Sequence, residues 1–217
     1  MRSDEDIKRD VEQELRWDPD INAIDIAVAV HGGVVTLTGF VRSYSQKYQA
    51  EVDAKRVAGV VAVANDLEVR LPTTDQRPDP EIARDAVAAL RNELPYSWEQ
   101  IKIVVKDGWI TLEGNVEWNY QRERAENAVR RVKGVKGISN LIKLKPKVEP
   151  IDVKRKIEDA LKRIAELDAN RIQVESNGSE VILRGTVRSW AERQEAERAA
   201  WAAPGVTKVD NRLIISP

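Results

Sequence analysis

The chain contains one sequence pattern three times without gaps, and three glycines mark its copies: Gly39, Gly114 and Gly185. In every copy a leucine stands two positions before this glycine and a valine two positions after it. A Gly-Val pair and an asparagine then follow at fixed distances. Similarity at a fixed period is typical of a repeated structural unit, so the shared positions are expected to serve the fold. These further shared residues are Gly59, Gly134 and Gly205, and Asn65, Asn140 and Asn211.

The spacing of the three glycines, 75 and then 71 residues, predicts three domains in a chain of 217 residues. This spacing overrides the one or two domains that the length alone would suggest. Polar segments with prolines, residues 72–80 and 145–150, are typical of short linkers. We therefore expect domains over 1–72, 78–146 and 150–217. Domains of this size have small cores, and contact between neighbours would stabilise them.

Each copy shows the same alternation of helical and extended patterns. In the first copy, apolar residues recur every four positions at Ile7, Val11 and Leu15, which predicts a helix with one buried face. Two runs of alternating apolar residues follow, separated by the hairpin-turn residues 31–33. A second helix is predicted through Ala50, ending at the Gly-Val pair where glycine suits a left-handed cap, and a last strand completes the unit.

The predicted class is α+β, with three tandem α-β-β-α-β domains. Each domain is expected to be a two-layer sandwich in which two helices pack on one face of a three-stranded sheet. Gly39 and Ala50, and their counterparts, are small residues. We interpret them as positions that allow the second helix to approach the sheet closely.

The Leu-x-Gly-x-Val motif, followed by Gly-Val and Asn, resembles the BON domain, which is named for bacterial osmotically inducible and nodulation proteins. The motif stands at 37–41, 112–116 and 183–187, and the resemblance covers nearly the whole chain. It implies an α-β-β-α-β domain without known catalytic activity, a role in osmotic and envelope stress, and binding of phospholipid surfaces. Many relatives are exported or lipid-anchored and have two copies. Another relative joins one such domain to a LysM module and senses potassium.

The residue types needed for catalysis are nearly missing from the sequence. There is no cysteine, and the single histidine, His31, falls in a predicted turn without a counterpart in the other copies. Nucleophilic triads and most transition-metal sites therefore lack their parts. Glu51, Glu126 and Glu197 recur once per copy, and a lone carboxylate is not an acid/base pair. We expect no catalytic residue, no metal site and no cofactor.

Charge and hydropathy limit the location and the partners. No apolar run approaches the roughly 18 residues that a membrane span requires. Residues 1–10 are acidic and polar, whereas a secretory signal begins with a basic and then an apolar segment, so a cytoplasmic location is expected. The formal net charge is -1, and a nucleic-acid binder usually has a strongly basic domain. We do not expect nucleic acid as a partner.

Aromatic residues gather near the predicted start of the second helix in every copy. A helix N-terminus has free N–H groups and partial positive charge, and amphipathic rings favour a membrane interface. This end of the domain could therefore receive an anionic lipid headgroup. Alternatively, the rings fix the helix to the sheet or fill contacts between domains. The residues concerned are Tyr44 and Tyr48, Trp118 and Tyr120, and Trp190.

The middle copy is mildly basic. Residues 73–149 hold 14 basic and 12 acidic side chains, whereas residues 1–72 hold 9 and 13. Lysines that alternate along the last strand and arginines of the preceding helix could bind acidic headgroups, each contributing about 1 kcal/mol near an anionic surface. The alternative is an edge strand protected by lysines and a solvated helix face. The residues are Lys133, Lys136, Lys143, Lys145, Lys147, Arg122, Arg124, Arg130 and Arg131.

The leading hypothesis is a non-catalytic module of stress adaptation that binds an anionic phospholipid surface. The first alternative is a protein-interaction or self-assembling scaffold, because three-stranded sheets have free edges that can pair. Potassium sensing, as in the relative with a LysM module, is a further alternative.

Overall fold

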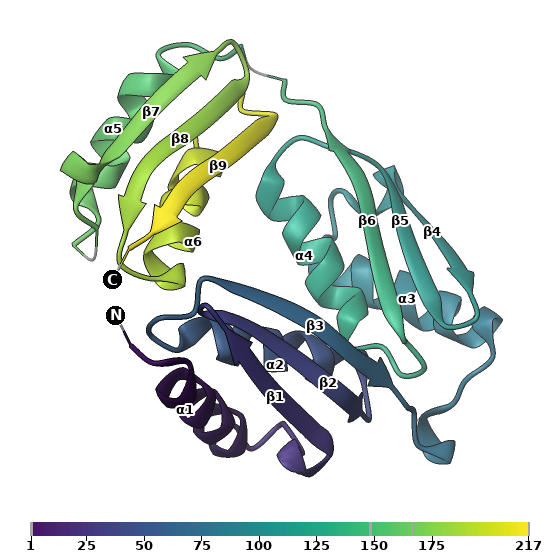
Figure 1. Cartoon of the computed structure of the whole chain (residues 1–217). Coiled ribbons are helices and arrows are strands. Elements are labelled where there is room, and N and C mark those ends of the chain that lie inside the picture. The colour runs from purple at the N-terminus through teal and green to yellow at the C-terminus, as the bar shows by residue number, and fades with distance from the viewer. Residues whose placement is uncertain (1, 148, 166, 217) are drawn as a thin grey trace.

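The computed structural model describes residues 2–147, 149–165 and 167–216, which form three successive domains of the same topology (Figure 1). The first domain consists of α1 (Asp4–Trp17), β1 (Ile26–His31), β2 (Val34–Val41), α2 (Tyr44–Arg56) and β3 (Ala62–Val69). The middle domain consists of α3 (Asp79–Glu93), β4 (Ile101–Lys106), β5 (Trp109–Val116), α4 (Asn119–Arg130) and β6 (Gly137–Leu144). The third consists of α5 (Val153–Arg163), β7 (Ile172–Asn177), β8 (Glu180–Val187), α6 (Trp190–Trp201) and β9 (Lys208–Ile215).

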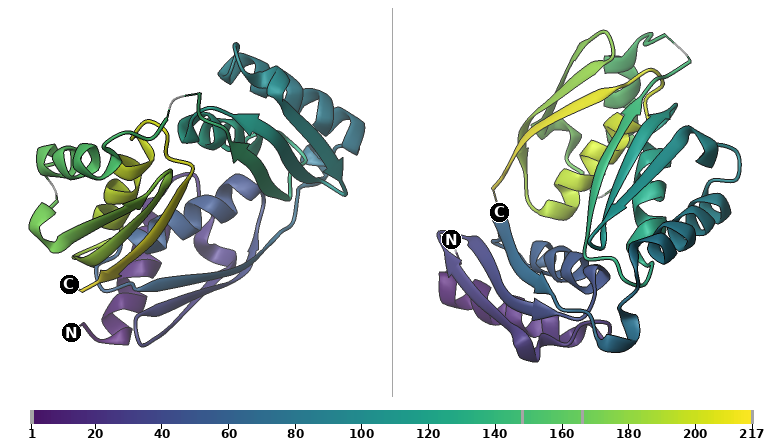
Figure 2. Two further views of the ribbon diagram at one scale, coloured as in Figure 1. Left: turned by 90° about the horizontal axis from the view of Figure 1, so that it is seen from above. Right: turned by 90° about the vertical axis from the view of Figure 1, so that its right-hand side faces the viewer.

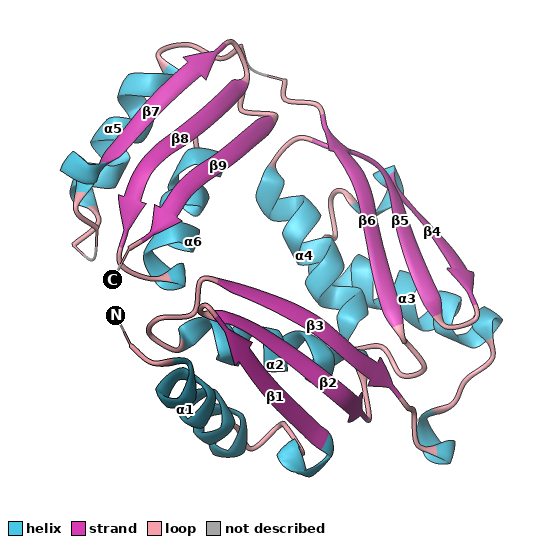
Figure 3. Cartoon of the chain, viewed as in Figure 1, coloured by secondary structure: helices cyan, strands magenta, loops and turns pink. Residues whose placement is uncertain are grey.

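Each domain has one three-stranded sheet with its second strand in the centre. The first two strands form an antiparallel hairpin, and the third strand returns through the second helix to lie parallel to the second strand. Both helices cover one face of their sheet, as the secondary-structure colouring makes clear (Figure 3). The α+β prediction of three tandem two-layer sandwiches is therefore confirmed.

The predicted periodicities coincide with the buried residues. On α1, Ile7, Val11 and Leu15 are at most 2% exposed, and they pack into a core with Leu37 and Ala50 from the sheet and from α2. The other two domains have separate cores built from the equivalent positions. Each domain thus buries its own apolar face, as the i, i+4, i+8 and period-two patterns require.

The anchor glycines have a different structural reason from the one that we inferred from the sequence. Gly39 has a φ of +113°, and a β-carbon on it would lie 2.0 Å from the carbonyl oxygen of Asp25. Asp25 ends a short 3-10 turn before β1, so the close neighbour is backbone of this turn and not the second helix. Gly114 and Gly185 face the equivalent carbonyls at 2.0 and 1.9 Å. The interpretation that these glycines let the helix approach the sheet is therefore wrong.

The second helices also end earlier than the sequence predicts. α2 ends at Arg56, and Gly59 lies in the turn that follows with a φ of +93°. The left-handed conformation expected for this glycine is present, but it belongs to the turn into β3. Gly134 and Gly205 likewise lie beyond the ends of their helices, and their φ angles are +91° and +85°.

The three domains close on one another around their second helices. α2, α4 and α6 lie toward the middle of the molecule, and the two chain ends lie near each other in all three views (Figures 1 and 2). α2 contacts α6, so the first and third domains touch although they are farthest apart in sequence. The sheets keep their second face free of helices, and these faces lie outside the central group of helices.

Candidate binding surfaces

Three of the predicted aromatic residues lie in contacts between domains. Tyr44, at the start of α2, packs against the core of the middle domain, and Trp190, at the start of α6, packs against the core of the first domain. The guanidinium carbon of Arg130 lies 3.3 Å from the ring centre of Tyr48. Burial raises the pKa of Tyr44. These positions fit the alternative that the rings fill contacts between domains.

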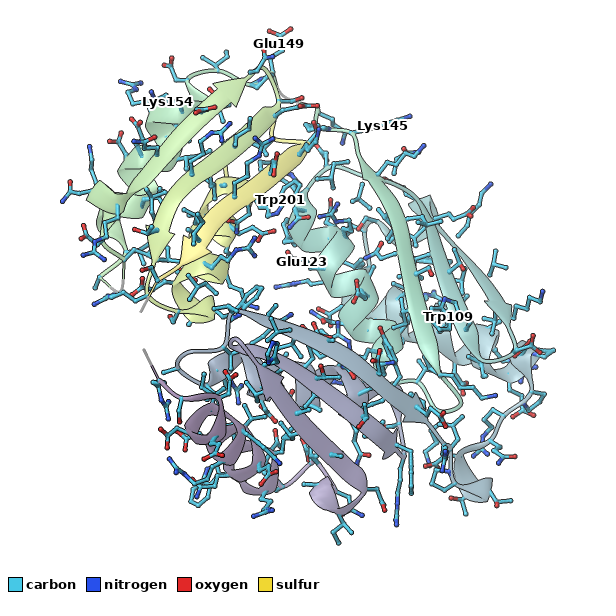
Figure 4. The ribbon with its side chains drawn as sticks, viewed as in Figure 1. Trp109, Glu123, Lys145, Glu149, Lys154 and Trp201 are labelled. Atoms are coloured by element: carbon cyan, nitrogen blue, oxygen red, sulfur yellow. The ribbon has the colours of Figure 1, made fainter. Side chains whose placement is uncertain are left out.

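The contacts between domains follow one geometric rule. The residue sixteen positions after each anchor glycine is Lys55, Arg130 or Trp201. Each lies in the last turn of its second helix, beside the first part of another second helix. The ammonium nitrogen of Lys55 lies 5.1 Å from the ring centre of Trp190. At the junction of α6 and α4 the ring belongs to Trp201 and the cation to the partner helix: the guanidinium carbon of Arg122 lies 4.9 Å from the ring centre of Trp201. Figure 4 labels Trp201. Each junction thus contains one cation–π contact.

The shared asparagines and glutamates support these junctions. The side-chain amide of Asn65 on β3 donates to the backbone carbonyl of Lys47, at 2.8 Å, and to the carboxylate of Glu51 on α2, at 3.3 Å. Its oxygen accepts from the backbone N–H of Leu67. Asn140 and Asn211 make the equivalent bonds. The asparagine therefore ties the last strand to the second helix in all three domains.

Each glutamate then holds the residue that makes the domain contact. Glu51 pairs with Lys55 at 2.5 Å, and Glu126 pairs with Arg130 at 2.9 Å. In the third domain the indole N–H of Trp201 donates to its glutamate at 3.4 Å. In the sequence, these pairs are visible as a glutamate four residues before a cation. The sequence alone did not show that this cation makes a contact between domains.

The remaining predicted residues of α4 are dispersed. Trp118 is half-buried and immediately precedes α4, whereas Tyr120 is 52% exposed with the guanidinium of Arg124 at 5.6 Å. Arg124 also lies 3.8 Å from Glu93. Arg122 is engaged at the contact with Trp201. These side chains do not form one surface.

Some of the other predicted cations form ion pairs, and others do not. Lys133 pairs with Asp75 at 3.2 Å, and Lys147 pairs with Glu117 at 3.1 Å. Four other exposed cations have no ion pair among the described residues: Arg131, Lys136, Lys143 and Lys145. β6 ends at Leu144, so the predicted alternation of three lysines along this strand is wrong: Lys143 lies in it, and Lys145 and Lys147 follow it. Lys143 and the α4 arginines do not form a single patch, because α4 covers one face of the sheet and Lys143 extends from the other. Figure 4 shows Lys145 where β6 leaves the sheet.

The structure does bring four of the predicted residues together, in what we call the junction pocket. This pocket of about 180 Å³ lies between the start of α2 and the end of α4. Arg42 and Ser43 line it beside the predicted residues, and the Ser43 hydroxyl accepts from the backbone N–H of Gln46 as the α2 N-cap. The predicted residues in its lining are Tyr44, Arg130, Arg131 and Lys133.

Sequence reasoning missed an exposed apolar group on the middle sheet. Val104, Trp109 and Leu141 are 54%, 49% and 56% exposed, on the face opposite the helices. The alternation along the strands placed them on that face, but whether the three side chains lie next to one another depends on the register of three strands.

None of the described helices combines the length and the apolar composition that a membrane span requires. Among the described side chains, no group of three or more His, Cys, Asp or Glu residues could hold a metal ion.

Three successive α-β-β-α-β units with a pocket at a domain junction place this chain, by its architecture, in the class of tandem small-domain proteins. The family is shown by comparison: the chain belongs to the BON domain family, whose model matches residues 3–70, 78–146 and 152–217. It is also similar to Osmotically-inducible protein Y of Escherichia coli (strain K12), with 33% identity over 138 residues. That match covers 58% of this chain and 64% of the relative.

Two solved structures of CdsD, a structural protein of the type III secretion system of Chlamydia trachomatis, are similar at a low level. Both have a TM-score of 0.28, with 14% and 13% identity. The first match covers 98% of this chain and 93% of that one, and the second covers 100% of both. A likeness of this degree has no bearing on the function of this chain.

Proposed function

We propose that the protein is a non-catalytic binding protein of osmotic or envelope stress adaptation, and that its ligand is an anionic phospholipid surface. Membership of the BON family and similarity to an osmotically inducible protein support the stress role. The ligand is inferred from the chemistry of the middle domain and of its junction with the first domain.

The junction pocket is the observation that supports this ligand. The N–H groups and the partial positive charge at the start of α2 favour an anion there. Arg42 and Arg131 add two exposed guanidinium groups without an ion pair among the described residues. Lys133 is held by Asp75 at the same pocket. A headgroup phosphate matches this set in charge and in its need for several donors.

Co-sedimentation with lipid vesicles tests the proposal. We expect the chain to bind vesicles of phosphatidylcholine with an equal part of phosphatidylglycerol, and to bind phosphatidylcholine vesicles far less. Salt should reduce this preference because it screens exposed charges. The double variant Arg42→Gln and Arg131→Gln should weaken binding at low salt by roughly tenfold or more. The control Lys156→Gln and Lys162→Gln makes the same change in net charge on exposed positions of α5 and should bind nearly as well. Equal binding to both kinds of vesicle at low salt would contradict the proposal.

Self-assembly is a second candidate, favoured by the free edges of the sheets. In each domain the first and third strands pair on one side only, and unpaired strand edges can add strands from another chain. If this is the function, light scattering without lipid should show association that increases with protein concentration. A mass that stays monomeric over the measured range would exclude it.

A further inference from the structure

The indole of Trp109 forms a fixed platform on the outer face of the middle sheet. Its N–H donates to the hydroxyl of Ser139 at 2.9 Å. A β-carbon on Gly137 would lie 2.3 Å from a ring carbon, so the ring lies across this glycine on the neighbouring strand. Nearly half of the side chain is still exposed. Figure 4 shows Trp109 on this sheet, away from the central helices.

Apolar and cationic side chains of the neighbouring strands lie around the Trp109 platform, as the strand register shows. Trp109 pairs with Lys106 on β4, and the same face continues through Val104 and Lys102. On β6 the face continues through Leu141 and Lys143. All of these side chains are exposed, and the three lysines have no ion pair among the described residues. Glu113 is the one acidic residue in the three strands, and it is the register partner of Lys102 on this face.

The other two domains lack this combination. Val34 and Glu180 stand at the position of Trp109, and a residue with a side chain stands at the position of Gly137: Ala62 or Lys208. In the third domain the equivalent face is crossed by ion pairs, such as Lys208 with Glu180 at 3.3 Å. The apolar and unpaired cationic character therefore belongs to the middle domain.

We propose that this outer face, with Trp109 at its centre, is the surface that contacts an anionic lipid bilayer. The inference rests on the proposed function and assigns it a contact surface that is separate from the junction pocket. Tryptophan favours the membrane interface, and lysines around it are complementary to anionic headgroups. The three exposed apolar side chains are far too few for the roughly 1,000 Å² of a stable protein interface, but they suit shallow insertion between headgroups. Because the indole is already positioned, little ordering is needed on binding.

Three variants of the full chain separate the parts of this surface. Trp109→Ala removes the platform and should weaken binding to the phosphatidylglycerol-containing vesicles by roughly tenfold. Gly137→Ala keeps the indole but displaces it, and the alanine and lysine at this position in the other domains show that the strand accepts a side chain. It should lower affinity in the same direction. Lys102→Gln with Lys106→Gln should weaken binding by roughly 30-fold at low salt and much less at high salt.

Matched controls are available on other elements. Trp17→Ala removes a tryptophan that is 85% exposed at the end of α1, and Lys156→Gln with Lys162→Gln removes two charges from α5. Both should bind like the wild type, and circular dichroism should show that every variant is folded. If the wild type binds anionic vesicles and the outer-face variants bind equally well, this inference is overturned while the proposed function stands. If the wild type does not bind, both fail.

Discussion

Asp53 is a fully buried carboxylate on α2, at a position where the other domains have Ala128 and Ala199. One oxygen accepts from Gln49 and from Arg56, both at 2.9 Å, and the other has no hydrogen-bond partner. Burial raises the pKa of Asp53 to about 6, and the nearby Asp18 carboxylate at the end of α1 adds to the rise. The folded protein therefore binds this proton more tightly than the unfolded chain does.

The consequence is a loss of stability as the pH rises between about 4 and 6, because the folded protein must then hold a buried charge. Asp53→Ala should increase the free energy of unfolding at pH 7 by about 1 to 3 kcal/mol. This gain should disappear near pH 3, below both pKa values, where the carboxyl is mostly protonated in the folded and in the unfolded state. Urea unfolding at the two pH values measures the difference. A gain of the same size at both would mean that the buried charge is not its cause.

At the scale of elements, the junction between the 3-10 turn and the first strand depends on the anchor glycine. Gly185 has a φ of +120°, and a β-carbon there would lie 1.9 Å from the carbonyl oxygen of Arg171. Gly185→Ala should lower the free energy of unfolding by about 2 to 4 kcal/mol, because the strained backbone angle and the clash with the carbonyl oxygen must both be relieved. Gly178→Ala is the control in the same domain: its φ is +58° and nothing lies within 4 Å of the added carbon. Gly178→Ala should lower the free energy of unfolding by about 1 kcal/mol. Similar losses in urea unfolding of the two variants would show that the clash is unimportant.

The elements themselves were largely predictable from the sequence, whereas the surroundings of their side chains were not. The stripe of Ile7, Val11 and Leu15 is local information, and a helix must bury it. The sequence showed that Tyr44 and Trp190 belong to one group of aromatic residues, but an amphipathic ring at a helix start suits a membrane interface and a contact with another domain equally well. The sequence does not show which of the two covers the ring, because the covering residues belong to another domain. The Trp109 platform likewise needs the pairing of β5 with β6, which places Gly137 under the ring.

At the scale of the whole molecule, three similar junctions close the chain on itself, and only the junction of the first and third domains lacks a direct linker. Trp190 is its central side chain: it packs on the core of the first domain and receives the ammonium of Lys55. Because no linker connects these two domains directly, only non-covalent contacts such as this one hold them together.

Trp190→Ala should therefore open the molecule while leaving each domain folded, since its ring packs on the core of a different domain. Small-angle X-ray scattering should show a radius of gyration larger by on the order of 1 to 2 Å, against roughly 17 Å for a compact chain of this length. Circular dichroism should be unchanged, and the control Trp17→Ala should scatter like the wild type. The junction pocket and the outer face of the middle sheet both lie away from Trp190, so lipid binding should survive opening. Unchanged scattering by Trp190→Ala would mean that the other two junctions alone keep the molecule closed.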